Sequence, residues 1–191
     1  MSNLTCEPKM KVIRTRIKDL VSIEPSVFGD DRGYFMESFS AKWFEEHVCN
    51  TQFVQDNESK SNKGVLRGLH FQNPPYAQAK LVRVIEGEVL DVAVDLRKNS
   101  PTYGQYEKMV LSGDNKKQFF IPKGFAHGFL VLSETALFSY KVDNFYEPKH
   151  DSGILWNDDT LNIDWGLDEK MIQISKKDKV QQEFKDFNSK F

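Results

Sequence analysis

Short apolar runs separated by turn residues follow one another through the middle of this 191-residue chain. The turns include Ser112-Gly113-Asp114-Asn115 and Pro122-Lys123-Gly124. Regularly spaced short strands with turns of this kind are typical of a β-sandwich or barrel and not of alternating βα units. The sequence therefore predicts a mainly β fold, with strands at residues 81–85, 89–96, 108–112, 118–121, 128–132 and 136–142.

The first two of these runs flank Glu86-Gly87, and this arrangement predicts a β-hairpin. In the second run, apolar residues alternate with Asp91 and Asp95. Because side chains on a strand point alternately to its two faces, we expect one face of the hairpin to lie on a core.

Helix signals are few and lie outside these strands. Ser40 is a candidate cap for a short helix through Trp43, Phe44 and Val48. Near the C-terminus, apolar side chains recur at helical spacing. Both segments predict peripheral helices that pack on the β core, the second through Val180, Phe184 and Phe187.

Composition excludes several classes of protein. With 39% apolar residues and a net charge of −2, the chain should bury a core as one domain over residues 1–191, with N-terminal strands and a C-terminal helical segment. The 26 Lys and Arg residues are interleaved with 28 Asp and Glu residues, which argues against a nucleic-acid-binding face. No apolar run approaches the ~20 residues of a membrane helix, and Met1–Pro8 lacks the apolar centre of a signal peptide. We therefore expect a cytoplasmic protein, with Cys6 and Cys49 as reduced thiols.

Two of the four histidines lie in unusual surroundings. His70 lies on a Gly-rich predicted strand, where alternation puts it on one face with Gln72 and puts Arg67 on the other. His127 lies just before the next predicted strand, in the pattern Pro122-x-Gly124-x-x-His127. Either histidine taken alone is more typical of a structural role than of a catalytic one.

The pattern around His127 resembles the second motif of the cupin superfamily, which is a double-stranded β-helix jelly roll. The corresponding first motif here is His70-x-Gln72, which supplies only one imidazole. Transition-metal sites commonly use three or more N, O or S ligands. We therefore expect a jelly-roll barrel without a bound metal.

Six segments, two of which contain His70 and His127, resemble in order the dTDP-4-dehydrorhamnose 3,5-epimerase family between about residues 13 and 178. The resemblance implies a metal-free and cofactor-free cupin fold, and a homodimer that acts on a dTDP-4-keto-6-deoxy sugar. The segments are DRGYFME (31–37), FVQDN (53–57), GVLRGLHFQ (64–72), AKLVR (79–83), FAHGF (125–129) and WND (156–158).

The resemblance also assigns catalytic roles. A ketone at C4 acidifies the hydrogens on C3 and C5, so inversion needs a base, a group that stabilises the enolate oxygen and an acid on the opposite face. The resemblance implies that His70 is the base, that Asp178 orients it and that Tyr140 is the acid. Lys80 and Arg67 would supply positive charge to the enolate oxygen and the phosphates.

Each role has an ordinary structural alternative. Asp178 would also suit the cap of a helix that starts near Lys179. Tyr140 would also suit a buried position with its hydroxyl on a backbone carbonyl. Lys80 and Arg67 would also suit the solvated surface.

For the nucleotide, the resemblance implies contacts from residues of both the N-terminal and the C-terminal regions. Tyr146 would stack on thymine, and Asp151 stands where the family often has glutamate. The family's N-terminal strand crosses to the partner, so the sequence leaves open which subunit's site Arg32 and Glu37 serve. The remaining expected contacts are Gln55, Asp56, Asn57, His127 and Lys177.

The expected reaction converts dTDP-4-dehydro-6-deoxy-D-glucose to dTDP-4-dehydro-L-rhamnose, which a separate reductase would use in dTDP-L-rhamnose biosynthesis. No Gly-rich dinucleotide fingerprint is present, consistent with a reaction without net redox change. Three alternatives stay open: a 3-epimerase, a 3,4-ketoisomerase on the same nucleotide sugar, and a non-catalytic jelly roll that only binds it.

Overall fold

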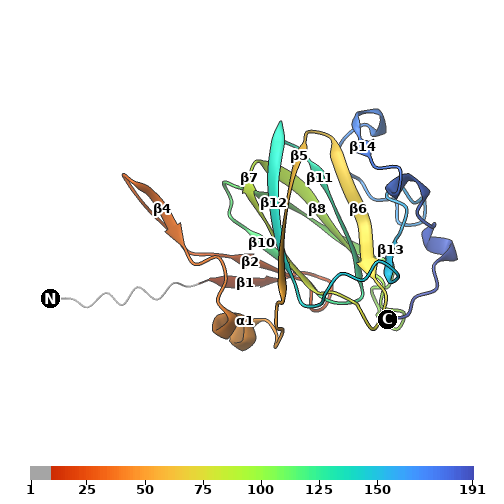
Figure 1. Ribbon diagram of the computed structural model, residues 1–191, viewed down its shortest axis with the longest axis horizontal. Coiled ribbons are helices and arrows are strands. Elements are labelled where there is room, and N and C mark those ends of the chain that lie inside the picture. Colours follow the sequence, from red (N-terminus) through yellow and green to blue (C-terminus); the bar gives the residue numbers. More distant parts are fainter. Residues whose placement is uncertain (1–9) are drawn as a thin grey trace.

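Two antiparallel sheets face each other in the computed structural model, which describes residues 10–191 (Figure 1). The first sheet has the order β1 (Lys11–Arg14), β2 (Val21–Glu24), β10 (Gln118–Ile121), β7 (Lys80–Glu86), β12 (Thr135–Val142) and β5 (Gln55–Asn62). The second has the order β13 (Asp151–Gly153), β6 (Val65–Gln72), β11 (Phe125–Val131), β8 (Glu88–Asp95) and β9 (Tyr106–Ser112), and β14 (Gln173–Ile174) pairs in parallel with β6.

This architecture confirms the predicted mainly β jelly roll. The strand expected at 118–121 coincides with β10, and those expected at 108–112, 128–132 and 136–142 correspond to β9, β11 and β12. The turn clusters between them end the strands as predicted, since Gly, Pro, Asn and Asp favour turn conformations.

The predicted hairpin over residues 81–96 is wrong. β7 and β8 do follow each other around Gly87, but they belong to different sheets and do not pair. Gly87 has a φ of +78°, and a Cβ there would lie 2.0 Å from the Thr135 carbonyl oxygen, so the corner between the sheets requires glycine. β8 is buried on both faces, and therefore Asp91 and Asp95 are inside the protein instead of facing water.

A register shift between β6 and β11 changes which side chains enter the barrel. His127 lies opposite His70, but Phe129 lies opposite Arg67, so β6 holds one extra residue between these pairs. The predicted separation of His70 and Arg67 onto opposite faces is therefore wrong, since both line the same cavity. His127 lies within β11 and not before it.

The helix predicted from Ser40 is confirmed as α1 (Ala41–His47), with the Ser40 hydroxyl accepting from the Trp43 amide. The predicted C-terminal helix is wrong. Two single 3₁₀ turns, η2 (Asp178–Val180) and η3 (Phe184–Asp186), replace it, and Val180 is exposed. A third 3₁₀ turn, η1 (Glu169–Met171), precedes β14. The spacing of apolar residues alone does not distinguish a helix from such turns.

Apolar side chains form three clusters that hold these parts together. One, including Phe119, Phe129 and Phe138, lies between the two sheets. A second joins the outer face of the β6 sheet to the C-terminal segment, which runs along that face in Figure 1. A third seats α1 on the first sheet through Phe44 and Phe120.

A two-stranded arm, β3 (Val27–Asp30) and β4 (Gly33–Met36), projects away from both sheets (Figure 1). Its aromatic side chains are exposed, including Phe35 at 69%. Among the described residues, no helix is long and apolar enough to cross a membrane. Cys49 is a free, half-buried thiol, whereas Cys6 and the Met1–Pro8 segment lie outside the described residues.

Candidate active site

A polar cleft lies between the two sheets and is lined by residues of β5, β7 and β12 on one side and of β6 and β11 on the other. It consists of an inner cavity of about 510 Å³ and an adjoining outer cavity of about 380 Å³. Both cavities are lined by His70, Lys80, Tyr140 and Lys177, so these four side chains stand where the two meet. Charged residues inside such a cleft interact more strongly than they would on an open surface.

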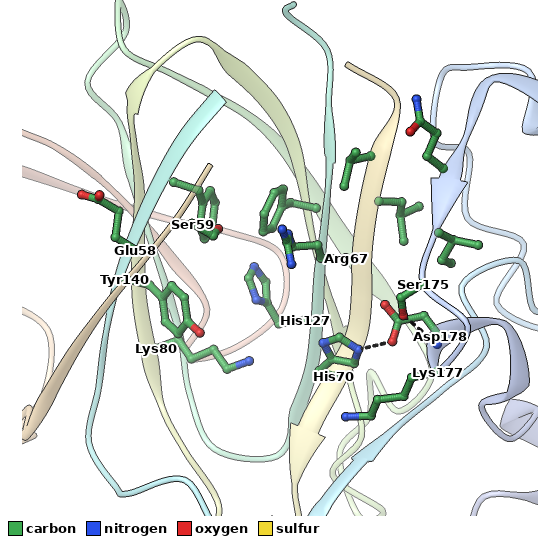
Figure 2. Close-up of a pocket in the computed structure, with 16 residues that line it drawn as sticks. Glu58, Ser59, Arg67, His70, Lys80, His127, Tyr140, Ser175, Lys177 and Asp178 are labelled. Carbon is green, nitrogen blue, oxygen red and sulfur yellow. Dashed lines mark hydrogen bonds and ion pairs between the residues drawn. The ribbon is translucent and has the colours of Figure 1, made fainter. Parts of the chain in front are cut away.

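His70 and Asp178 form a hydrogen-bonded pair at this junction, with 2.7 Å between Nε2 and Oδ1 (Figure 2). Asp178 is buried, which opposes its ionisation, but the hydrogen bond and charge of His70 outweigh this effect and lower its pKa. The carboxylate holds the Nε2 proton and leaves Nδ1 free to accept one. The alternative in which Asp178 caps a helix is wrong, because Lys177 and not Asp178 precedes the η2 turn, and the Asp178 carboxylate bonds His70.

Tyr140 reaches the cleft from β12, on the side opposite His70 (Figure 2). Its side chain lines both cavities, and within residues 10–191 its hydroxyl forms no hydrogen bond to a backbone carbonyl, so the alternative of a phenol satisfied in this way is wrong. Burial raises the pKa of Tyr140, and the charge of Arg67 opposes this shift. The phenol is therefore protonated at neutral pH and available as a donor.

Lys80 enters the same cleft from β7 and has no ion-pair partner in the described part of the chain. Burial lowers the pKa of Lys80 to about 8, although the charges of Asp91 and Asp151 oppose the shift. Arg67 also lines the inner cavity, where its Nε donates to the Ser61 hydroxyl over 3.0 Å. The solvated-surface alternative is wrong for Lys80, which is half-buried, whereas Arg67 lines the cavity and is also exposed to solvent.

A second His–Asp pair lies deeper in the barrel. Nε2 of His127 is 3.0 Å from both carboxylate oxygens of Asp91, and both side chains are buried. Burial raises the pKa of Asp91 and lowers the pKa of His127. Asp91 was not predicted as a site residue, because its alternation with apolar residues on β8 is also typical of a solvated face. The sequence signal for a buried Asp91 is that apolar residues occupy positions on both faces of β8 around it.

The outer cavity is lined by polar residues from several elements. On β5, Gln55 Nε2 donates to Asn57 Oδ1 over 2.7 Å, and both side chains face the cavity. Tyr146 donates its hydroxyl to Asp151 Oδ2 over 3.1 Å. Lys177 pairs with the same carboxylate, and this pairing raises the pKa of the lysine. Five of the predicted contact residues thus gather around one cavity.

Three predicted contact residues lie elsewhere. Asp56 points to the other side of β5 and pairs with Lys141 at 2.8 Å, because alternation separates it from Gln55 and Asn57. Arg32 lies on the projecting arm, where it pairs with Asp30, and Glu37 follows the arm. Neither Arg32 nor Glu37 lines either part of the cleft within this chain.

The residue types in the cleft suit acid–base chemistry and anion binding more than metal coordination. Across residues 10–191, no three side chains of His, Cys, Asp or Glu come together in a way that could hold a metal ion. Two lysines, one arginine and two histidines line the inner cavity, together with Asp178 and Glu58. Such a set of donors favours a ligand with negative charge.

Comparison with known proteins agrees with this chemistry. The family model described as dTDP-4-dehydrorhamnose 3,5-epimerase matches residues 14–186. A protein of that name from Shigella flexneri is 56% identical over 178 residues, which are 93% of this chain and 97% of the relative. The crystal structure of the enzyme from Elizabethkingia anophelis has 54% identity and a TM-score of 0.89, covering 93% of this chain and 97% of that one.

A second solved structure is from Legionella pneumophila and is named dTDP-6-deoxy-D-glucose-3,5-epimerase in complex with dTDP-4-keto-L-rhamnose. It has 51% identity and a TM-score of 0.91, covering 94% of this chain and 95% of that one. The similarity to these proteins, in both sequence and fold, extends over nearly the whole chain. The chain therefore belongs to the dTDP-4-dehydrorhamnose 3,5-epimerase family.

Proposed function

We propose that this protein inverts C3 and C5 of dTDP-4-dehydro-6-deoxy-D-glucose and releases dTDP-4-dehydro-L-rhamnose. The observation that carries the proposal is the His70–Asp178 pair, which faces the Tyr140 phenol across a cleft lined with cations. A base and an acid on opposite sides of a carbon are what an inversion requires. The family relationship supports the choice of substrate.

In this proposal, Nδ1 of His70 takes the proton from the carbon next to the C4 ketone. The electron pair of the C–H bond moves into the C–C bond of an enolate, and the negative charge goes to the C4 oxygen. Asp178 stabilises the imidazolium that forms, since its carboxylate already accepts the Nε2 proton. Tyr140 then returns a proton from the opposite face. Water takes the proton from the His70 imidazolium and gives one back to the Tyr140 oxygen, after which the same steps serve the second carbon.

Lys80 and Arg67 would stabilise the enolate oxygen and the adjacent phosphate. A fixed positive charge near a developing oxyanion lowers the barrier, and removing one such donor typically reduces turnover by ~10²–10³ fold. Neither cation is held by an ion pair in the described residues, so both remain available to the ligand. No cofactor is needed, because the reaction involves proton transfers only.

The outer cavity would hold the nucleotide. Thymine would stack on Tyr146, the diphosphate would lie near Lys177, and Gln55 and Asn57 would bind polar groups of the nucleoside. Asp151 would take part by linking Tyr146 and Lys177. His127 would close the inner end of the site.

We propose a homodimer in which the β3–β4 arm reaches the partner's cleft. The arm exposes Tyr34 and Phe35, which is unfavourable unless another surface covers them. Crossing would also bring Arg32 and Glu37 to a site that they do not reach within one chain. We further propose that the chain acts in the cytoplasm as a single domain, supplying a product for dTDP-L-rhamnose biosynthesis.

The test is incubation of the purified protein with the 4-keto-6-deoxyglucose nucleotide in deuterium oxide. The proposal predicts deuterium at both C3 and C5 of an L-rhamno product. Label at C3 alone would make the protein a 3-epimerase, and a shift of the ketone to C3 would make it a ketoisomerase. If neither label nor product formed, the protein would be a jelly roll that binds the nucleotide sugar without converting it.

A further inference from the structure

We infer that Gln72 is a positioning residue that holds Tyr146 in the orientation needed to receive a flat aromatic base. This inference rests on the proposed function, because it assigns the outer cavity to the nucleotide. Gln72 lies on β6, is 4% exposed and lines the outer cavity, and it is not among the residues that the sequence predicted to bind the substrate.

The side-chain amide of Gln72 is used entirely by backbone groups of the neighbouring loops. Its Nε2 donates to the Tyr76 carbonyl oxygen over 2.7 Å and to the Phe145 carbonyl oxygen over 3.1 Å. Its Oε1 accepts from the Glu147 amide over 2.7 Å. Both amide hydrogens and the carbonyl oxygen therefore have partners.

Two of these partners flank Tyr146 in the chain. Phe145 precedes it and Glu147 follows it, so one side chain fixes the peptide groups on both sides of the tyrosine. This segment lies between β12 and β13 and has no strand pairing to hold it. The start of the segment is held by Gln78, whose Nε2 donates to the Asn144 carbonyl oxygen over 2.8 Å, and by Asn144, whose Nδ2 donates to the Pro75 carbonyl oxygen over 3.2 Å. The Gln72 amide holds the peptide groups on both sides of Tyr146.

Tyr146 has little else to orient it. Its side chain is 56% exposed, and its one side-chain hydrogen bond joins the hydroxyl to Asp151. If the backbone at Tyr146 were mobile, the hydrogen bond of its hydroxyl alone would still let the ring change its orientation. A fixed backbone limits the orientations in which the ring faces the cavity. Ordering the ring before binding reduces the entropy lost when a ligand stacks on it.

The position of Gln72 also connects the two ends of the cleft. It lies two residues after His70 on the same strand, so the strand that carries the base also carries the clamp on the stacking ring. The spacing between ring and base is then set by one rigid element. A nucleotide that stacks on Tyr146 would therefore deliver its sugar to a constant place relative to His70.

The experiment measures binding of two probes, dTDP and inorganic pyrophosphate, to the full chain by calorimetry. Gln72→Met keeps the length of the side chain and removes all three hydrogen bonds. We expect it to raise the Kd for dTDP about tenfold, within the range of base–aromatic stacking, and to change the Kd for pyrophosphate less than twofold. With substrate, KM should rise while kcat stays within about twofold.

A double-variant cycle separates positioning from general loosening of the fold. In the Tyr146→Ala background, Gln72→Met should have no further effect on dTDP binding, because the ring that it positions is gone. Equal weakening of both probes, or additive effects in the double variant, would overturn the inference. Gln118→Met is the matched control, since the buried Gln118 amide also donates to a backbone carbonyl, that of Ser38 over 2.7 Å, but not beside Tyr146.

A second variant covers the case in which Gln72→Met does not fold. Gln72→Asn keeps an amide in the same buried place but is one methylene too short to reach both loops, and the same selective loss of dTDP affinity is expected. Binding of dTDP does not depend on turnover. A wild-type protein that binds dTDP but produces no epimer would therefore refute the proposed function, whereas an additive cycle would refute only the role of Gln72.

Discussion

Nε2 of His70 lies 2.7 Å from Oδ1 of Asp178, although 108 residues separate the two in the chain. β14 makes this contact possible by pairing in parallel with β6, with Ile174 opposite Leu66. The chain then turns at η2 and directs the Asp178 carboxylate back toward the strand that carries His70. The orientation of the base therefore depends on how the C-terminal segment packs on the barrel.

Replacing the base should separate catalysis from binding. His70→Asn removes the group that accepts the proton, and general base catalysis typically contributes ~10²–10⁴ fold. We expect kcat to fall by about 10³ fold or more, while the Kd for dTDP changes less than about threefold. His47→Asn, in the exposed histidine of α1, is the control and should keep full activity. Steady-state kinetics and calorimetry check both, and an active His70→Asn protein would falsify the assignment of the base.

Lys80 should give activity an alkaline limit. Its pKa of about 8 means that the ammonium is lost as the pH rises through that value. We expect kcat/KM, which reports groups of the free enzyme, to fall about tenfold per pH unit above this point. Lys80→Met should be slower by ~10²–10³ fold and should lack this limb of the profile. A limb that persists in Lys80→Met would assign the titration to another group.

Protein stability should change in the opposite direction over the same range. Between pH 8 and the ordinary lysine value of 10.5, the unfolded chain holds a proton on Lys80 that the folded protein has released. The free energy of unfolding attributable to this residue therefore rises with pH in that window. Comparing urea unfolding of wild type and Lys80→Met at pH 7 and pH 10 measures this contribution. The loss of activity thus cannot be attributed to unfolding caused by Lys80.

Tyr140→Phe should uncouple proton removal from inversion. The substitution deletes the hydroxyl that has no partner within residues 10–191 and keeps the ring that packs near Phe138. Since His70 stays in place, we expect exchange of substrate hydrogen with deuterium oxide to continue while formation of the L-rhamno product falls by ~10² fold or more. Nuclear magnetic resonance of the mixture follows both processes. Parallel loss of exchange and product would instead place Tyr140 in the first proton transfer.

Gly68 should be intolerant of even one methyl group. It has a φ of +143°, and a Cβ there would lie 2.5 Å from the Gly128 Cα on β11. Backbone strain and overpacking of this kind together cost on the order of 3 kcal/mol of unfolding free energy. Gly166→Ala isolates the first effect, because its φ is +75° but its added Cβ meets nothing within 4 Å. Urea unfolding should show a clearly larger loss for Gly68→Ala, and equal losses would contradict the close approach of the two strands.

Much of the fold follows from local signals in the sequence. The strand at 118–121 and the helix after Ser40 were predicted because turn residues and a capping hydroxyl mark their ends. The change of sheet at Gly87 was missed, since a tight turn between two apolar runs is equally typical of a hairpin. Pairing with strands distant in the chain decides whether β7 and β8 form a hairpin or belong to different sheets.

The candidate site was predictable to a similar extent. The family resemblance pointed to Asp178, whereas local pattern favoured a helix cap equally. Arg67 was put on the wrong face because the extra residue in β6 depends on its pairing with β11. Asp91 and the role of Gln72 were missed because both depend on contacts with segments that are distant in the chain.

The late arrival of Asp178 has a consequence for synthesis. A ribosome makes His70 first and its partner 108 residues later, which at roughly 5–20 residues per second is an interval on the order of 5–20 s. During that time the nascent chain already contains the imidazole but nothing that fixes its tautomer. The nascent chain therefore cannot act on a nucleotide sugar in the proposed way until the C-terminal segment has left the exit tunnel and packed on the barrel.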